Sequence, residues 1–139
     1  IASCALIAGH VTVEDQAFVS GCVVVHQYCR IGRLAMIGGG VRVNQDLPPF
    51  FLYSGVYASP VGLNLVGLRR AGFTAGEIAD IKRAYRLLYR SKLKLKEALE
   101  RIEREIDSPH ARHIVEFVRA TKRGIAHEHE GRARFRFEG

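Results

Sequence analysis

The sequence lacks any long apolar run. No stretch approaches the roughly 18 consecutive apolar residues that cross a membrane, so stable membrane insertion is not expected. The start also lacks the basic, apolar and small-residue zones of a signal peptide. No methionine stands at residue 1, and we therefore expect the natural chain to continue upstream.

Cysteine is scarce, and metal-binding patterns are missing. Cys4, Cys22 and Cys29 are too few for a disulfide scaffold and lack the spacing of zinc ligands, so we interpret them as reduced thiols of a cytoplasmic protein. The run HEHE at 127–130 has no partner ligands in the sequence. The run GGG at 38–40 lacks the lysine and helix of a phosphate-binding loop. No metal and no cofactor is predicted.

The first part of the chain lacks any net charge. Residues 1–60 hold three basic and three acidic residues, whereas residues 61–139 hold 18 basic and 11 acidic residues and supply the whole net charge of +7. This difference suggests two architectures. Acidic and basic residues alternate in the second part, which favours ion-paired helices over a nucleic-acid-binding surface.

A six-residue repeat is present from the first residue onward. Eight successive hexads begin with Ile or Val, and the fifth position of each is small or modestly apolar. This period predicts a parallel β-helix in which each hexad forms one face and three hexads form one coil, with the first position pointing inward.

Residues 18 apart should therefore stack in successive coils, about 4.8 Å from each other. Cys4 and Cys22 are expected to be stacked neighbours, as repeat filler rather than as a redox pair. In VVVHQYCRIG, residues 23–32, Val25 takes the inward position. His26 and Gln27 should then lie side by side on the outer surface, available to a ligand.

Pro48 and Pro49 are expected to end the repeats, because proline cannot donate to a strand ladder. The predicted domains are a β-helix at 1–47, an exit loop at 48–60, an α-helical domain at 61–124 and a mobile tail at 125–139.

Four helices are predicted in the second part. The first is short and lies within residues 61–72, and the third covers residues 94–106. The second covers about 75–90, starting with a Thr74–Glu77 capping box. The fourth starts with Ser108 as N-cap and Pro109 at the first helical position.

Four motifs give the sequence a family resemblance over about residues 5–124. They are AGHVTVED, VHQYCRIG, QDLPPF and GLRRAGF. Together they resemble the UDP-N-acetylglucosamine O-acyltransferases that begin lipid A synthesis. The resemblance implies a left-handed parallel β-helix with an α-helical C-terminal domain, assembled as a cytoplasmic homotrimer.

The resemblance also implies the chemistry. A 3-hydroxyacyl chain passes from acyl carrier protein to the 3-hydroxyl of UDP-N-acetylglucosamine, with a histidine base and a backbone N–H that binds the oxyanion. Gly9 matches the oxyanion glycine, and His10 matches a histidine of the catalytic site that lines the sugar. His26 and Gln27 match the pair that contacts the sugar nucleotide.

Three further positions match the family. Gly39 lies where the family sets the depth of the acyl groove. Asn64 and Arg70 match nucleotide contacts, with Arg70 placed to neutralise phosphate. Positive surface on the helices is expected to meet the acidic acyl carrier protein.

The sequence departs from the family at several points. The family's catalytic histidine stands about one coil before His10, upstream of residue 1. Tyr57 and Val66 stand where members often have a histidine and an acidic residue, and Ala71 replaces a second basic residue. Two alternatives therefore stay open, a non-catalytic trimeric scaffold and a related N-acyltransferase of the same pathway.

Overall fold

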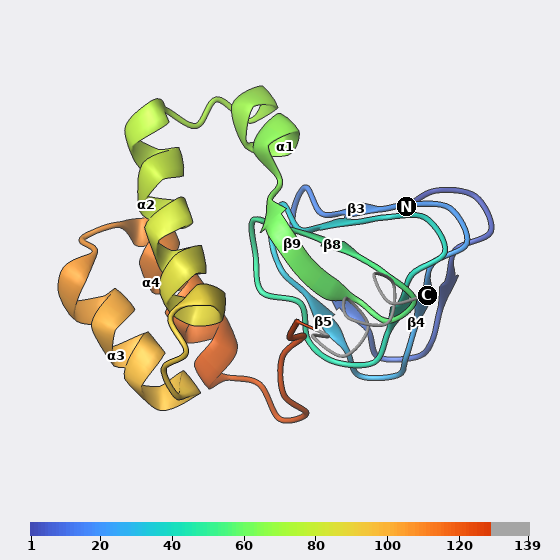
Figure 1. Ribbon diagram of the computed structural model, residues 1–139. Helices are drawn as coiled ribbons and strands as arrows, with labels where there is room; N and C mark the ends of the chain where they lie inside the picture. Colours follow the sequence, from blue (N-terminus) through green and yellow to red (C-terminus); the bar gives the residue numbers. More distant parts are fainter. Residues whose placement is uncertain (129–139) are drawn as a thin grey trace, which may run out of the picture.

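The chain forms triangular coils of parallel β-structure with helices packed on one side, as the computed structural model shows for residues 1–128 (Figure 1). Each two-residue strand consists of the first position of a hexad and the residue before it. The strands are β1 Leu6–Ile7, β2 Thr12–Val13, β3 Phe18–Val19, β4 Val24–Val25, β5 Arg30–Ile31, β6 Met36–Ile37 and β7 Arg42–Val43.

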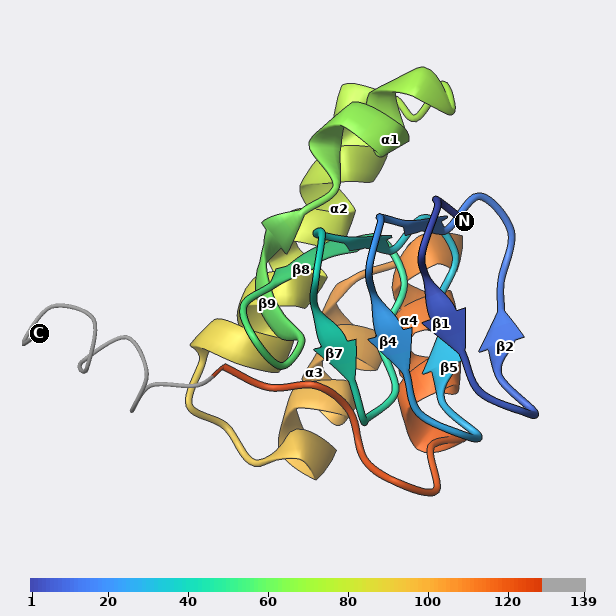
Figure 2. The ribbon, with the colours of Figure 1, turned by 90° about the vertical axis from the view of Figure 1, so that its right-hand side faces the viewer.

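The coils stack in parallel register with the predicted period of three hexads. Ile7 pairs with Val25 and Val25 with Val43, so β1, β4 and β7 form one face, visible side by side in Figure 2. Strands β2 and β5 form the second face, and β3 and β6 begin the third. The first and fifth hexad positions point inward and are buried in the second and third coils. The predicted parallel β-helix is confirmed.

The coil corners show a regularity that the hexad pattern did not reveal. The fourth hexad position has a left-handed backbone in every repeat up to residue 40, with φ between 56° and 65° at the non-glycine positions and 72° at Gly40. A left-handed conformation costs a non-glycine residue about 1–2 kcal/mol. The corner turns the second to fourth positions outward, and the buried first and fifth positions offset this cost.

The β-helix does not end at the prolines, contrary to the prediction. Leu47 bridges to Ile31, and strand β8 (Phe51–Ser54) pairs in parallel with β6. The offset is shorter than a full coil, since Met36 pairs with Leu52 and not with Ser54. Strand β9 (Ser59–Leu63) then returns antiparallel to β8. The prolines are tolerated because they precede β8.

Most of residues 48–60, expected as an exit loop, therefore belong to a β-hairpin. Residues 61–63, expected as the start of a helix, are the end of strand β9. The reason is pairing with β8, since this short apolar segment has no strong preference of its own.

The four predicted helices form, and two of them start at the capping signals found in the sequence. Helix α1 covers Leu65–Arg70, α2 covers Ala75–Tyr85 and continues as the π-helical η1 (Arg86–Arg90), α3 covers Leu95–Glu105, and α4 covers Pro109–Arg119. The Thr74–Glu77 capping box forms, and Ser108 caps α4 with Pro109 in the first turn. The Thr74 backbone N–H, together with the His110 ring 2.6 Å away, lowers the pKa of Glu77 to about 2.

Helix α4 fixes the helical domain to the β-helix. Arg30 donates from Nη1 to the Phe117 carbonyl at 3.0 Å, and its guanidinium lies 4.1 Å from the centre of the Phe117 ring. His113 reaches Glu14 at 3.0 Å. Among residues 1–128, no helix is both long and apolar enough to span a bilayer.

The segment after α4 returns to the coils. Ile125 bridges to Asp46, Ala126 is buried, and Tyr89 donates its hydroxyl to the Ala126 carbonyl at 2.8 Å. Residues 125–128 therefore belong to the folded domain and are not part of a mobile tail. The rest of the tail predicted at 125–139, residues 129–139, lies outside the described residues.

We predict that Gly32→Ala destabilises the chain by about 1–3 kcal/mol, because a β-carbon there would lie 2.4 Å from Pro49 N. Gly38 is a matched control at the same hexad position, where a β-carbon would lie 3.5 Å from its nearest neighbour, the Tyr53 carbonyl oxygen. Urea unfolding of both alanine variants measures the difference. Equal midpoints would contradict the close packing of Gly32 on Pro49.

Candidate functional site

Four predicted site residues meet at one corner of the β-helix. We call it the histidine corner, made of residues 8–10 and 26–28, between the β1–β4–β7 face and the β2–β5 face. Ile7 pairs with Val25, so Gly9 stacks with Gln27 of the next coil. His26 lies beside Gln27 at the same corner. His26, Gln27, Gly9 and His10 are all exposed. The prediction that His26 and Gln27 point outward is confirmed.

Tyr28 stacks on His10 in this corner. Their ring centroids lie 5.0 Å apart and their planes differ by 7°, while the Tyr28 N–H donates to the Gly9 carbonyl at 3.3 Å. One face of the imidazole is therefore covered by an aromatic ring. The sequence interpretation missed Tyr28, although the period of one coil already placed it over His10.

The backbone of the histidine corner offers hydrogen-bonding groups as well. Within residues 1–128, the Gly9 N–H has no hydrogen-bond partner, and a β-carbon added at Gly9 would have no atom within 4 Å. A free N–H beside open space can bind an anionic oxygen. Arg123, from the segment after α4, donates to the Gln27 carbonyl and brings a cation to this corner. Arg123 was also missed, because it lies near the far end of the sequence from Gln27.

Gly39 lies at a different corner. This glycine corner comprises residues 2–4, 20–22 and 38–40, between the β3–β6–β8 face and the β1–β4–β7 face. A β-carbon at Gly39 would lie 3.6 Å from the Gly21 carbonyl oxygen, an ordinary contact, and the φ of Gly39 is not positive. The position is exposed and can hold a larger side chain without backbone strain.

Asn64 lies against the third corner, and Arg70 lies at the far end of the helix that Asn64 caps. The Asn64 side chain is buried, donates to the Leu34 carbonyl at 2.9 Å and accepts from Gly67 N at 3.1 Å. Its amide therefore fixes the start of α1 to the β-helix. Arg70 is exposed at the end of α1. One chain does not bring these two residues to the histidine corner.

The three positions that depart from the family pattern, Tyr57, Val66 and Ala71, lie outside the histidine corner. Tyr57 continues the β1–β4–β7 face through a parallel bridge to Arg42. Val66 is 59% exposed on α1, and Ala71 is the C-cap of that helix. None of the three disturbs the histidine corner, which lies in other coils.

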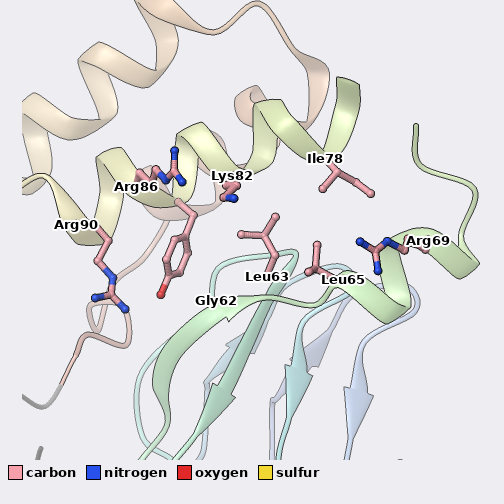
Figure 3. A pocket seen from close by; sticks show the side chains of 9 residues that line it. Gly62, Leu63, Leu65, Arg69, Ile78, Lys82, Arg86 and Arg90 are labelled. Carbon is pink, nitrogen blue, oxygen red and sulfur yellow. The ribbon is translucent and has the colours of Figure 1, made fainter. Parts of the chain in front are cut away.

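A cationic cleft of about 420 Å³ separates β9 and α1 from α2 and η1 (Figure 3). Its apolar lining comes from both sides and includes Leu63, Leu65, Ile78 and Tyr85. Four basic side chains surround this lining: Arg69, Lys82, Arg86 and Arg90. Arg90 pairs with Glu128 at 2.9 Å. The sequence predicted positive helices but not this cleft.

Comparison with known proteins gives one family. The family model described as UDP N-acetylglucosamine O-acyltransferase, domain 2, matches residues 46–126. Relatives named acyl-[acyl-carrier-protein]–UDP-N-acetylglucosamine O-acyltransferase are 45% identical over 118 residues in Gloeothece citriformis and 45% identical over 125 residues in Alkalilimnicola ehrlichii. These alignments cover 85% and 89% of this chain, and 43% and 48% of the relatives.

Solved structures agree with these sequence relatives. The UDP-N-acetylglucosamine acyltransferase of Francisella novicida is 35% identical with a TM-score of 0.86, covering 94% of this chain and 49% of that one. The Arabidopsis enzyme is 38% identical with a TM-score of 0.84, covering 89% and 47%. The chain spans about half the length of the proteins it matches.

We predict that Tyr28 changes the magnetic environment of His10 through its ring current. Tyr28→Leu should move the His10 imidazole proton resonances downfield, whereas Tyr28→Phe should preserve them, since aromatic stacking needs the ring and not the hydroxyl. The His26 resonances serve as an internal control. Identical His10 shifts in both variants would show that the two rings do not stack in solution.

Proposed function

The chain belongs to the UDP-N-acetylglucosamine O-acyltransferase family, and we propose that it is the C-terminal part of an active member. The complete protein transfers a 3-hydroxyacyl chain from acyl carrier protein to the 3-hydroxyl of UDP-N-acetylglucosamine, the first step of lipid A synthesis. The observation that carries this proposal is the histidine corner, where Gly9, His10, His26 and Gln27 are exposed in neighbouring coils.

The proposed reaction divides its tasks among these residues. The base that takes the sugar hydroxyl proton lies upstream of residue 1, one coil before His10. The Gly9 N–H, which has no partner among residues 1–128, binds the oxyanion that forms when the sugar oxygen attacks the thioester. His10 lines the sugar, while His26 and Gln27 contact the sugar nucleotide. The corner is held by backbone hydrogen bonds, so these groups are oriented before substrate binds.

We propose a homotrimer whose sites form between subunits. The histidine corner, Gly39 in the glycine corner and Arg70 at the end of α1 lie in separate places of one chain, which supports sites that a second copy completes. Exposed apolar side chains on two faces, Leu6 at 66% and Phe18 at 51%, support their burial against another copy. By family resemblance the coils are left-handed, and the enzyme works in the cytoplasm without stable membrane insertion or nucleic acid.

A non-catalytic scaffold and a related N-acyltransferase are the alternatives. Hexads upstream of Ile1 without a histidine one coil before His10 would favour the scaffold. Transfer to an amine-bearing sugar nucleotide, with none to UDP-N-acetylglucosamine, would favour the N-acyltransferase. Assaying the complete protein with both acceptors separates the three possibilities.

Subunit complementation tests the shared site. In the complete protein, His10→Ala and Arg70→Ala should each leave little activity. When the two variants are co-expressed, random trimers should recover about one quarter of wild-type activity, because half of the histidine corners and half of the Arg70 positions are intact. A co-expressed pair no more active than the single variants would place both residues in one chain's site.

We further propose that acyl carrier protein docks at the cationic cleft. The cleft combines an apolar lining with basic side chains, and Lys82 and Arg86 have no acidic partner within residues 1–128. An acidic carrier domain complements this charge. Its bound acyl chain offers apolar groups as well.

Charge reversal tests the docking site. Lys82→Glu with Arg86→Glu should raise KM for the carrier-bound donor about 10-fold or more at low salt, through slower association. KM for UDP-N-acetylglucosamine should not change. Lys94→Glu with Lys96→Glu, at exposed positions at the start of α3, is the control with the same change in net charge. An equal effect of the two double variants would mean that only net charge matters.

Gly39 is proposed to set the depth of the acyl groove. Gly39→Met fits the backbone, and its side chain would fill space otherwise open to about four methylenes. Each excluded methylene loses about 0.8 kcal/mol of burial, so the donor preference should shift by around four carbons, with roughly 100-fold weaker use of the original chain. Competing donors of graded length measure this shift, and Gly39→Ala should produce a smaller one. Lower activity at an unchanged preferred length would show that Gly39 does not border the groove.

A further inference from the structure

Two exposed cysteines share one column of the glycine corner. Cys4 and Cys22 hold the same hexad position in successive coils, both thiols are free and exposed, and their φ angles are 63° and 59°. The coils are in register on both sides of the pair. Cys22 N donates to the Ser3 carbonyl at 3.3 Å, and Leu6 N donates to the Val23 carbonyl at 2.8 Å. Equal backbone conformations in stacked coils direct the two Cα–Cβ bonds the same way.

The spacing of the pair is suitable for a disulfide. Adjacent parallel strands lie about 4.7–4.9 Å apart, which is within the roughly 4.4–6.8 Å that separates the α-carbons of bridged cysteines. Parallel side chains hold the β-carbons near the strand spacing, slightly beyond their usual separation of about 3.5–4.5 Å. A bond formed here is therefore strained, and strained, exposed disulfides are easily reduced.

The repeat pattern alone favours filler at these positions, but both thiols are free and exposed in stacked coils. We propose that Cys4 and Cys22 form a redox-responsive dithiol, open under reducing conditions and closed to an intrachain disulfide by a small-molecule disulfide such as oxidised glutathione. One cysteine thiolate attacks oxidised glutathione, forms a mixed disulfide and releases one glutathione thiolate. The second cysteine thiolate attacks the protein sulfur of that mixed disulfide and releases the other. Two protons and two electrons leave the protein, and one oxidised glutathione becomes two reduced molecules.

The third cysteine, Cys29, does not compete with Cys4 and Cys22 for oxidised glutathione. Cys29 is buried, and its Sγ lies 3.7 Å from the Val43 carbonyl oxygen, to which the thiol donates. Burial raises the pKa of the Cys29 thiol, so less of the reactive thiolate forms. The third coil carries Gly40 in this column, so the link joins two coils and no more.

The disulfide would lie beside the column of Ser3, Gly21 and Gly39. Closing it ties the first coil to the second at this corner and should raise the melting temperature of the oxidised protein relative to the reduced protein. This inference does not rest on the proposed acyltransferase function. A protein without any transferase activity would form the same bond.

Mass spectrometry of the purified chain in glutathione redox buffers tests the proposal. With oxidised glutathione the wild type should lose two hydrogens and retain no glutathione, and reduced glutathione should reverse this change. Cleavage after Glu14 separates the two cysteines, so a linked pair of peptides identifies the bond. Cys29→Ser should behave as the wild type.

Single-cysteine variants show whether each thiol reacts alone. Cys4→Ser and Cys22→Ser should each keep one glutathione on the remaining exposed cysteine and should show no rise in melting temperature on oxidation. Three outcomes in the wild type would overturn the proposal. They are glutathione retained on Cys4 and Cys22, disulfides that link two chains, and no modification where the single variants are modified.

Discussion

In-register hydrogen bonding between successive coils is the constraint on which the rest of this structure depends. Each hexad contributes only two extended residues, too few to be stable as an isolated strand. Backbone hydrogen bonds between successive coils stabilise the strands instead. Leu6 N donates to the Val23 carbonyl, and Val24 N donates to the Val41 carbonyl. A slip by one residue would expose the inward Ile and Val positions. Each hexad position is therefore stacked on the same position of the next coil. Surface side chains that act together come from such columns.

The histidine corner and the coil beyond it use their side chains differently. In the first two coils His10 and Tyr28 point outward and stack on each other. In the third coil Asp46 is buried and accepts hydrogen bonds from Arg30 N at 2.9 Å and Thr121 Oγ1 at 2.6 Å. This carboxylate anchors the segment after α4. The same segment then brings Arg123 to Gln27, so closure of the fold supplies a cation to the histidine corner.

The sequence could predict whatever repeats with a constant period. Inward positions, the stacking of Cys4 on Cys22 and the outward direction of His26 all follow from the hexad and the coil of three hexads, because burial at fixed spacing is a local property. The end of the β-helix could not be predicted in this way. Leu52 pairs with Met36 and Tyr57 bridges to Arg42, both at less than a full coil, so the period is lost where the coil continues. The burial of Ala126 depends on contacts with residues far away in sequence, such as Tyr89. No local sequence pattern around Ala126 predicts this burial.

The candidate site residues lie in separate places of one chain, and this separation has a mechanical consequence. The histidine corner and the glycine corner are separated by strands, and Arg70 lies at the end of α1, so no side-chain rotation can bring Gly39 or Arg70 to the histidine corner of the same chain. The proposed threefold assembly would bring these places together between copies, with one interface used three times. In that assembly the groups proposed to orient the sugar and the position proposed to limit the acyl chain would belong to different copies. The proposed acyl groove would then change by substitution at the glycine corner, while the column of His10 and Tyr28 keeps its geometry, because each column is held by its own coils.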